Sequence, residues 1–568
     1  MALDQLKLEV LWNRLIATVN EQAAALMRTS FTSIVREAGD LSAGVFDRRG
    51  RMIAQAVTGT PGHINSMATS MGHVLRRYPV DSLAEGDVII TNDPWMTAGQ
   101  LNDITIFTPV FRAGRCVAFF ANCCHALDIG GRGLSADSLE VFEEGLQIPI
   151  LKLYEAGRPN ETLYALLKAN VRATDEVMGD LHSQVVGNEV GARQLLSFMD
   201  EFGLDDIEDV ADSIVARSES AMRERIAALP DGTYPFTMAC DGFDEPITLA
   251  AKVIIRGDAL TVDYGGTSGA IDRGINVTLN YTAAYTTYGI KCAISPDIPN
   301  NEGSFRPVTV TAPEGSILNC RHPSPVGGRH LVGHFLPSVV FGALEDILPQ
   351  RVMAASADAL WDTQVYGDRD DGSRFAYVWF AAGGAGAIRG RDGLSATAFP
   401  AGIAGVQSEM IEALVPIVVG ERELVTDSGG PGRWRGGLGQ KFTIGVRGDR
   451  PFLFSGLYDR MDHPAHGING GAAGAVGHLA TKSGKDVRAK TRVVLPPGEE
   501  VTLTLPGGGG YGPATERPVE TVAADVLDGY VSAERARTFY GVALDPSGLS
   551  VDEVETARLR NAMTSTKD

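Results

Sequence analysis

Apolar residues near the amino terminus recur at the spacing of an amphipathic helix. Leu8, Leu11, Leu15, Val19 and Leu26 fall on one face when residues are placed at about 3.6 to a turn. Such a helix needs a partner for its apolar face. We therefore expect it to dock against a core or against another subunit.

From residue 40 onward the pattern changes to short strands separated by turns. Residues 41–47 and 52–56 flank the turn Asp47-Arg48-Arg49-Gly50, an arrangement typical of a hairpin. Beyond the hairpin the sequence predicts one helix and then three strands, at residues 64–77, 88–91, 104–111 and 116–122.

The middle of the chain has a more helical pattern, and its last third consists of strands and glycine-rich turns. The turn Pro230-Asp231-Gly232 follows the predicted helices and suggests a boundary near residue 230. Helices are predicted at residues 161–202, 205–228, 280–294, 333–348 and 533–540. Antiparallel strands are predicted at residues 233–241, 247–256 and 259–264.

These elements predict an α+β fold with mixed helices and several antiparallel or mixed sheets. We divide the chain into three modules. Residues 1–230 form a mixed module that carries the candidate site, residues 231–370 a middle α+β module, and residues 371–568 a glycine-rich module that is mostly β.

Composition and charge narrow the classes of function. The 568 residues are 44% hydrophobic and include 66 glycines, which favour turns and close backbone approaches. A net charge of −20 repels phosphate backbones and anionic lipid, so we expect neither nucleic acid nor a membrane surface as partner. We find no apolar run of about eighteen residues, and acidic residues interrupt the amino-terminal segment. A cytoplasmic location is therefore expected.

Several sequence motifs lack the context that their usual chemistry needs. Residues 507–512 match a dinucleotide-binding pattern, but Pro513 follows where a helix should begin. Residues 427–431 resemble a serine protease signature without its histidine segment. No Walker A sequence occurs, and the six cysteines form no zinc pattern. We expect these segments to be structural, and ATP to be consumed by another chain.

Three short segments concentrate side chains that could carry chemistry. They span residues 37–40, 100–103 and 125–128, and each lies at or beside the end of a predicted strand. Two aspartates, a histidine and a carboxamide would suit Zn²⁺, Mn²⁺ or Fe²⁺, which lowers the pKa of a bound water. The alternative is that the histidine is hydrogen-bonded in the core and the aspartates hold turns.

Several longer motifs stand in a fixed order along nearly the whole chain. They are Asn92-Asp93-Pro94-Trp95, Gly99-Gln100-Leu101-Asn102-Asp103, Thr108-Pro109-Val110-Phe111, His125 with Asp128-Ile129-Gly130-Gly131, Asp427-Ser428-Gly429-Gly430, Arg435-Gly436-Gly437 and residues 507–512. In these motifs and their order the chain resembles the hydantoinase B/oxoprolinase family, which also contains the large subunits of acetone and acetophenone carboxylases.

The resemblance implies a beta subunit that opens a small cyclic amide, such as a hydantoin, oxoproline or a lactam. A hydantoinase A-type ATPase alpha subunit would phosphorylate the amide oxygen with ATP and Mg²⁺, and the two chains would form an α2β2 or larger hetero-oligomer. Carried over by position, the ligands of a divalent metal would be Asp40, Gln100, Asp103 and His125. His63 would donate a proton, and Asp128 would take part in catalysis or orient the ligands.

Two departures from the family pattern affect the metal. Gln100 stands where the family segment Gly-Thr-His-Leu-Pro-Asp has histidine, and Ala126 replaces the second histidine of a pair. Losing an imidazole weakens binding of zinc-like ions and favours harder ones, and a metal-free site is the alternative. Two other functions stay open at this point, a carboxylase subunit acting on a phosphorylated ketone enol and a metal-free structural subunit.

Overall fold

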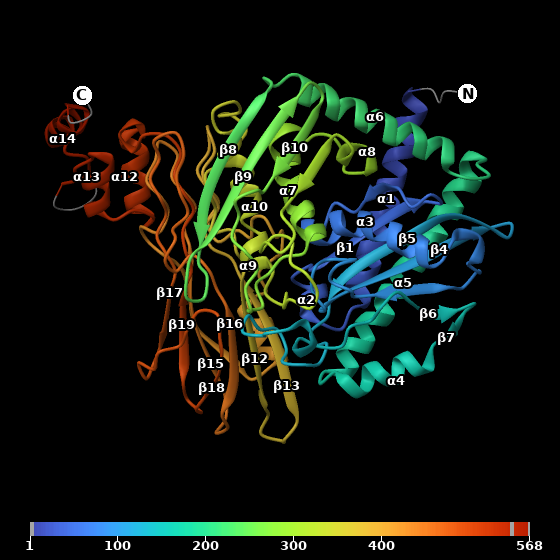
Figure 1. Ribbon diagram of the computed structural model, residues 1–568. Coiled ribbons are helices and arrows are strands. Elements are labelled where there is room, and N and C mark those ends of the chain that lie inside the picture. Colours follow the sequence, from blue (N-terminus) through green and yellow to red (C-terminus); the bar gives the residue numbers. More distant parts are fainter. Residues whose placement is uncertain (1–4, 546–549, 566–568) are drawn as a thin grey trace.

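The computed structural model describes residues 5–545 and 550–565, and its amino-terminal part is built on a seven-stranded antiparallel sheet (Figure 1). The strand order is β2-β1-β5-β4-β3-β6-β7. The strands are β1 (Leu41–Asp47), β2 (Met52–Gln55), β3 (Val88–Thr91), β4 (Asp103–Arg112), β5 (Arg115–His125), β6 (Leu151–Glu155) and β7 (Arg158–Pro159). The predicted hairpin and the three predicted strands after it are confirmed.

Helices cover both faces of this sheet, which is why its central strands read as apolar runs. Val45 and Phe120 pack with the amino-terminal helix on one face, and Phe46 and Phe119 pack with Met67 on the other. The first face is covered by α1 (Gln5–Thr29), α5 (Thr174–Phe202) and α6 (Glu208–Ala227), and the second by α3 (Pro61–Arg77). The predicted amphipathic helix is therefore confirmed as an element of the chain's own core.

The middle segment adds a four-stranded sheet in the order β11-β10-β9-β8 with helices against it. Its strands are β8 (Gly232–Cys240), β9 (Ile247–Arg256), β10 (Ala259–Asp263) and β11 (Val308–Thr311). The helices are α7 (Leu279–Ile294), α8 (Glu302–Phe305), α9 (His330–Gly333) and α10 (Leu336–Leu344). The three predicted antiparallel strands and the helix at about 280–294 are confirmed.

Two of the helices predicted from the sequence differ in detail from the structure. The helix at 161–202 is split into α4 (Glu161–Asn170) and α5, because Val171 is extended and Arg172 binds Asp128. The helix predicted at 333–348 is shorter, because α10 begins at Leu336 with Pro337 in its first turn and ends at Leu344, and the separate short helix α9 precedes it.

The carboxy-terminal segment contains two four-stranded sheets, in the orders β13-β12-β16-β18 and β14-β15-β19-β17. The first consists of β12 (Trp361–Asp368), β13 (Arg374–Ala381), β16 (Phe452–Leu457) and β18 (Arg492–Leu495). The second consists of β14 (Ile417–Leu424), β15 (Gln440–Val446), β17 (His478–Thr481) and β19 (Glu500–Thr504). Short helices α2 (Ser33–Arg36) and α11 (Ser408–Leu414) join neighbouring elements.

The glycine run at 507–512 is a tight crossing of backbones, as interpreted from the sequence. A Cβ atom on Gly508 would lie 2.1 Å from the carbonyl oxygen of Ala385. Backbone hydrogen bonds join Gly508 to Gly437 and Gly510 to Ala472 across the same crossing. Side chains are excluded because the neighbouring segments are within hydrogen-bonding distance of the run.

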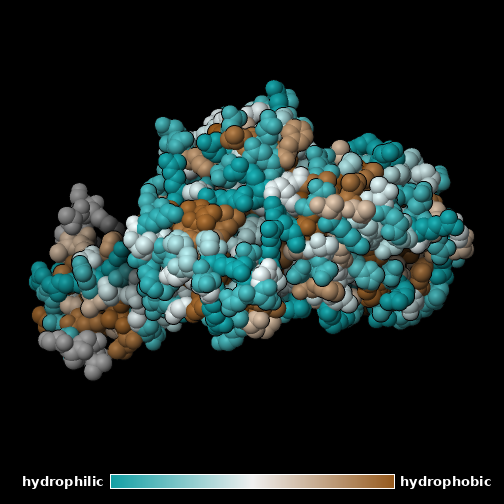
Figure 2. Space-filling view, turned by 90° about the horizontal axis from the view of Figure 1, so that it is seen from below, coloured by the Kyte–Doolittle hydropathy of each residue, from teal (hydrophilic) through white to brown (hydrophobic). Residues whose placement is uncertain are grey.

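Three helices form a small cluster at the carboxy-terminal end, drawn in red in Figure 1. They are α12 (Val519–Leu527), α13 (Ala533–Tyr540) and α14 (Glu553–Ser565), of which only α13 was predicted. Among the described residues no helix is both long and apolar enough to span a bilayer. The face shown in Figure 2 is mostly hydrophilic with several separate apolar patches. The fold is α+β, as predicted.

Candidate active site

Strand pairing brings aspartate and histidine side chains that are distant in the sequence to one point. Asp103 begins β4 and lies opposite His125, the last residue of β5. Asp40 directly precedes β1, and its carbonyl oxygen accepts a hydrogen bond from the backbone N–H of His125. Because β1, β5 and β4 are neighbours in the sheet, positions 40, 125 and 103 fall side by side at one end of it.

A cavity of about 30 Å³ is lined by Asp40, Gln100 and His125 at this end of the sheet. Its wall is completed by side chains from α3, α9, β12 and β13, among them His63, His330, Asp362 and Phe380. A single water molecule occupies about this volume. A whole organic substrate therefore fits only if part of the wall moves, and the cavity as it stands surrounds the reacting atoms alone.

The Asp103 carboxylate is the centre of a buried hydrogen-bond network. It forms an ion pair with Arg329, and its oxygens lie 3.0 Å from His63 Nε2, 3.0 Å from His125 Nδ1 and 2.9 Å from Gln100 Nε2. Burial alone would raise the pKa of Asp103, but the Arg329 guanidinium and then His63 hold it well below its usual range. Asp103 is therefore ionised and fixes the orientation of the groups around it.

His63 lies at the third position of α3, between the two carboxylates of the site. Its Nε2 lies 3.0 Å from Asp103, and its Nδ1 lies 3.6 Å from Asp40. Burial would lower the pKa of His63, but the charges of Asp103 and Asp40 raise it above its ordinary value. The imidazole therefore holds a proton more readily than a free histidine, as a proton donor requires. The structure brings His63 into the cavity, and its catalytic role stays a prediction.

Asp128, predicted to take part in catalysis, does not line this cavity. Its buried carboxylate accepts hydrogen bonds from the backbone N–H of Gly130, 3.1 Å away, and from the Arg172 side chain, 2.8 Å away. The backbone N–H of Arg172 donates to it as well. This position holds the loop after β5 to the start of α5, so the geometry gives the predicted catalytic role no support.

Sequence reasoning missed several residues of the site, which come from α9 and β12. Arg329 and His330 stand at the start of α9, and His334 follows one helical turn later. His330 Nε2 lies 3.3 Å from Asp362, and His334 Nε2 lies 3.0 Å from the hydroxyl of Tyr285. Two histidines four residues apart were a readable signal, because that spacing places both on one helix face.

Burial changes the pKa values of Asp362 and His330 in opposite directions. It raises the pKa of Asp362 well above its ordinary value, and it lowers the pKa of His330 well below the ordinary value for histidine. Burial therefore favours the neutral form of both side chains, which lie 3.3 Å apart.

Polar atoms of the cavity wall are left without hydrogen-bond partners. Buried polar groups almost always have such partners, so atoms that lack them indicate a place where a polar ligand or water binds. The atoms are His63 Nδ1, Gln100 Oε1, His125 Nε2, His330 Nε2 and Asp362 Oδ1.

The structure gathers Asp40, Gln100, Asp103 and His125 as the sequence predicted, but their arrangement does not fit a divalent metal. The Gln100 amide nitrogen, which has no lone pair for a metal, lies 2.9 Å from both Asp103 and His125. Arg329 already neutralises Asp103 in the buried network. No group of three or more His, Cys, Asp or Glu in residues 5–545 and 550–565 is placed to hold a metal ion. Metal binding stays a prediction without support from this geometry.

Comparison with known proteins identifies relatives over the full length of the chain. A family model described as hydantoinase B/oxoprolinase matches residues 4–514. The chain is similar to the beta subunit of caprolactamase from Pseudomonas jessenii, with 31% identity over 98% of this chain and 99% of that protein.

Solved structures show the same fold. The crystal structure of the ATP-dependent caprolactamase from Pseudomonas jessenii superposes with a TM-score of 0.89 and 29% identity, covering 99% of this chain and 100% of that one. A nucleotide-free structure of acetone carboxylase superposes with a TM-score of 0.85 at 20% identity, covering 98% of this chain and 83% of that one. The second likeness establishes a shared fold only.

Proposed function

The chain belongs to the hydantoinase B/oxoprolinase family, and we propose that it is the hydrolytic subunit of an ATP-dependent enzyme that opens a small cyclic amide. The proposal includes a separate ATPase subunit of the hydantoinase A type, because its caprolactamase relative is itself a beta subunit. The hetero-oligomeric assembly expected from the sequence is part of the same proposal. No Walker A sequence occurs in this chain, which agrees with ATP being bound elsewhere.

Activation by phosphate explains why two subunits are needed. An amide carbon is a poor electrophile, and phosphorylation of its oxygen makes the carbon open to attack by water. The first water bonds to that carbon, and the ring C–N bond breaks as the nitrogen takes a proton, which leaves an acyl phosphate. A second water then releases phosphate and the free carboxylate.

The site contains the groups that the first step requires. His125 Nδ1 lies 3.0 Å from Asp103 and its Nε2 has no hydrogen-bond partner, so we assign to Nε2 the role of accepting a proton from water. His63, with its raised pKa, supplies the proton that the leaving nitrogen takes. Arg329 keeps Asp103 ionised throughout. Because the donors do not fit a divalent ion, no step of this route uses one.

One structural observation gives this proposal its main support. Five buried polar atoms face a single cavity without hydrogen-bond partners, and they belong to three histidines, an aspartate and a glutamine. A structural core would pair these atoms, whereas a hydrolytic site leaves them for substrate and water. The family membership then selects cyclic amides as the substrate class.

The test is to co-express the chain with an A-type ATPase subunit and incubate the complex with ATP and a lactam, a hydantoin or 5-oxoproline. We expect ring opening without bicarbonate, measured as the released amino acid by chromatography. His125→Gln should abolish ring opening and leave the substrate-dependent ATPase of the partner largely intact. The matched control is His478→Gln at an exposed histidine, which should behave as the unaltered chain does.

Two outcomes would replace the proposal. Carboxylation of a ketone with bicarbonate, in a complex that opens no ring, would favour the carboxylase alternative. Full ring opening by the His125→Gln complex would show that this cavity is not the hydrolytic site.

A further inference from the structure

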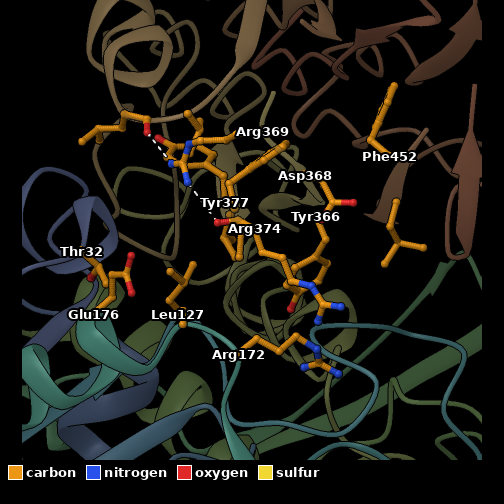
Figure 3. A pocket seen from close by; sticks show the side chains of 18 of the residues that line it. Thr32, Leu127, Arg172, Glu176, Tyr366, Asp368, Arg369, Arg374, Tyr377 and Phe452 are labelled. Carbon is orange, nitrogen blue, oxygen red and sulfur yellow. Dashed lines mark hydrogen bonds between the residues drawn. The ribbon is translucent and has the colours of Figure 1, made fainter. Parts of the chain in front are cut away.

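A second and larger cavity, of about 480 Å³, lies where β12 emerges from the core (Figure 3). Its walls come from the sheet that contains β12 and β13 on one side, and from Leu127 and the start of α5 on the other. None of the residues that line the active-site cavity lines this one. Its volume is typical of a site for a small organic ligand.

The two cavities lie along one face of the same pair of strands. Asp362 pairs with Phe380 in the active-site cavity, and Tyr366 pairs with Ala376 in the larger one. Alternate residues of a strand point to the same face, so side chains at 362, 364 and 366 share a face. The spacing of four residues from Asp362 to Tyr366 corresponds to about 13 Å along the strand.

The end of β5 also borders both cavities, on the side opposite β12. His125 lines the active-site cavity, and Leu127, two residues later, lines the larger one. Gln364 stands between them, fully buried, and its Oε1 accepts a hydrogen bond of 2.7 Å from the backbone N–H of Leu134. Its Nε2 lies 3.5 Å from the carbonyl oxygen of Leu127. Gln364, which lines neither cavity, and Leu127 therefore form part of the partition between the two cavities.

Unpaired positive charge marks the larger cavity, although the whole chain carries a net charge of −20. Four arginines and two acidic residues, Glu176 and Asp368, line it, and within the described residues neither Arg374 nor Arg492 forms an ion pair with a carboxylate. Burial and the nearby charges of Arg132 and Arg172 lower the pKa of Arg492. A concave site with an excess of guanidinium groups attracts anions.

A polar atom without a partner lies among these charges. The hydroxyl of Tyr366 is shielded from water and has no hydrogen-bond partner. The Arg172 guanidinium lies over the Tyr366 ring, 5.7 Å from its centre, and Figure 3 shows the two side chains together on the cavity wall. The remaining wall includes apolar side chains such as Leu453 and Val494. The cavity thus combines anion-binding groups with an apolar wall.

We propose that the larger cavity is a holding site, which binds the phosphate group of the activated substrate before the whole molecule moves to the active-site cavity. The ligand class is a small cyclic amide phosphorylated on its oxygen. This inference rests on the proposed function, because the partner subunit would supply that phosphorylated compound. The partition around Gln364 then opens to admit the reacting end of the ligand to the active-site cavity, whose present volume is about 30 Å³.

The phosphate site is tested on the full chain alone, by calorimetric titration with inorganic phosphate and with methyl phosphate at low salt. We expect one saturable site for each probe. Arg492→Gln should weaken binding about tenfold or more, because it removes a charged hydrogen-bond donor. The control is Arg321→Gln, an exposed arginine that pairs with Glu314; neither residue lines the cavity, so the affinity should stay unchanged.

A second variant tests whether the probes bind inside the cavity, because it fills the cavity without removing a charge. Ala376→Trp introduces a large side chain at a half-buried position of β13 in the cavity, and we expect it to block both probes while circular dichroism shows the native fold. Absence of saturable phosphate binding in the unaltered chain, or equal affinity in Arg492→Gln, would overturn the inference.

The complex with the partner distinguishes failure of the inference from failure of the proposed function. Arg492→Gln should lower the number of rings opened for each ATP consumed, because the activated substrate is lost before it reaches the active site. Phosphate binding that depends on Arg492, in a complex that opens no ring, would refute the hydrolase and keep the anion site. Efficient ring opening by a chain that binds no phosphate would refute the anion site and keep the hydrolase.

Discussion

Two carboxylates and two cationic side chains lie around the active-site cavity, and their summed charge determines which protonation states are favoured. Asp40 and Asp103 carry the negative charges, and Arg329 and protonated His63 carry the positive ones. Uncompensated charge is costly in a buried site. The cluster is neutral when His63 holds its proton, so the surroundings favour a histidine that acts as an acid.

This balance predicts how ring opening depends on pH. We expect kcat of the complex to decline as the pH rises through the raised pKa of His63, because the leaving nitrogen then lacks its proton donor. The measurement is kcat from about pH 6 to pH 9. His63→Gln should give a low rate without this alkaline decline. If the decline persists in His63→Gln, another group is the acid.

The same pKa shift has a consequence for stability. A histidine whose pKa is raised by folding stabilises the folded chain fully below its ordinary pKa of 6.5. That contribution is lost as the pH rises through the raised value. The unfolding midpoint in urea should therefore fall over this range in the unaltered chain, and less in His63→Gln.

Metal content tests the interpretation of the donor set. We expect the chain, purified from medium supplemented with Zn²⁺ and Mn²⁺, to hold under about 0.1 equivalent of either ion by elemental analysis. The double variant Gln100→His with Arg329→Gln should bind close to one equivalent. It replaces an amide with an imidazole and frees Asp103 from its guanidinium.

The single variants are the controls for this gain of binding. Gln100→His alone keeps the competing guanidinium, and Arg329→Gln alone lacks the added imidazole, so each should bind less metal than the double variant. A stoichiometric ion in the unaltered chain, removed only by a strong chelator, would restore the metal site predicted from the sequence.

The sequence predicted the convergence of positions 40, 100, 103 and 125, because all of them border strands of one sheet. It did not predict Arg329, whose partner Asp103 is 226 residues away. No local pattern records an ion pair between a strand end and a distant helix start. From the sequence we therefore expected a bound metal ion to supply the positive charge of the site, whereas a guanidinium of the chain itself supplies it.

At the scale of elements, the strands of the amino-terminal sheet were predicted correctly from apolar runs in the sequence. The strands have this pattern because helices cover both faces of the sheet. The break between α4 and α5 was missed because its cause lies outside the helical segment. Arg172, between the two helices, binds Asp128 in the loop after β5. Periodicity of side chains reports which face is buried, and it carries no information about such tertiary contacts.

The glycine crossing gives a prediction that belongs to this scale. Gly508→Ala should destabilise the chain by about 1–3 kcal/mol or more, because the added Cβ would overlap the Ala385 carbonyl oxygen. Gly269→Ala is the control, since a Cβ there meets no atom within 4 Å. Urea unfolding midpoints of the two variants provide the comparison. Equal midpoints would mean that the crossing separates easily and that its glycines are not needed for packing.

At the scale of the whole molecule, the largest hydrophobic cluster crosses the predicted boundaries near 230 and 370, although the amino-terminal sheet also has clusters of its own. The largest cluster of buried apolar residues runs from Ile34 to Tyr511 and draws on all three predicted modules. The active-site cavity is shared in the same way, since His63, Arg329 and Phe380 come from the three different modules. A site assembled from such distant segments exists only while the entire core is folded.

This shared core predicts one cooperative unfolding transition for residues outside the carboxy-terminal helical cluster. Modules with separate cores would unfold at separate temperatures, whereas a common core couples them. We expect scanning calorimetry of the chain to show one main peak whose calorimetric and van't Hoff enthalpies agree. The helices α12 to α14 pack around a small cluster of their own and should contribute at most a minor, earlier transition. Two large peaks of similar enthalpy would show that the modules fold independently, and the active site would then be formed by docking of preformed domains.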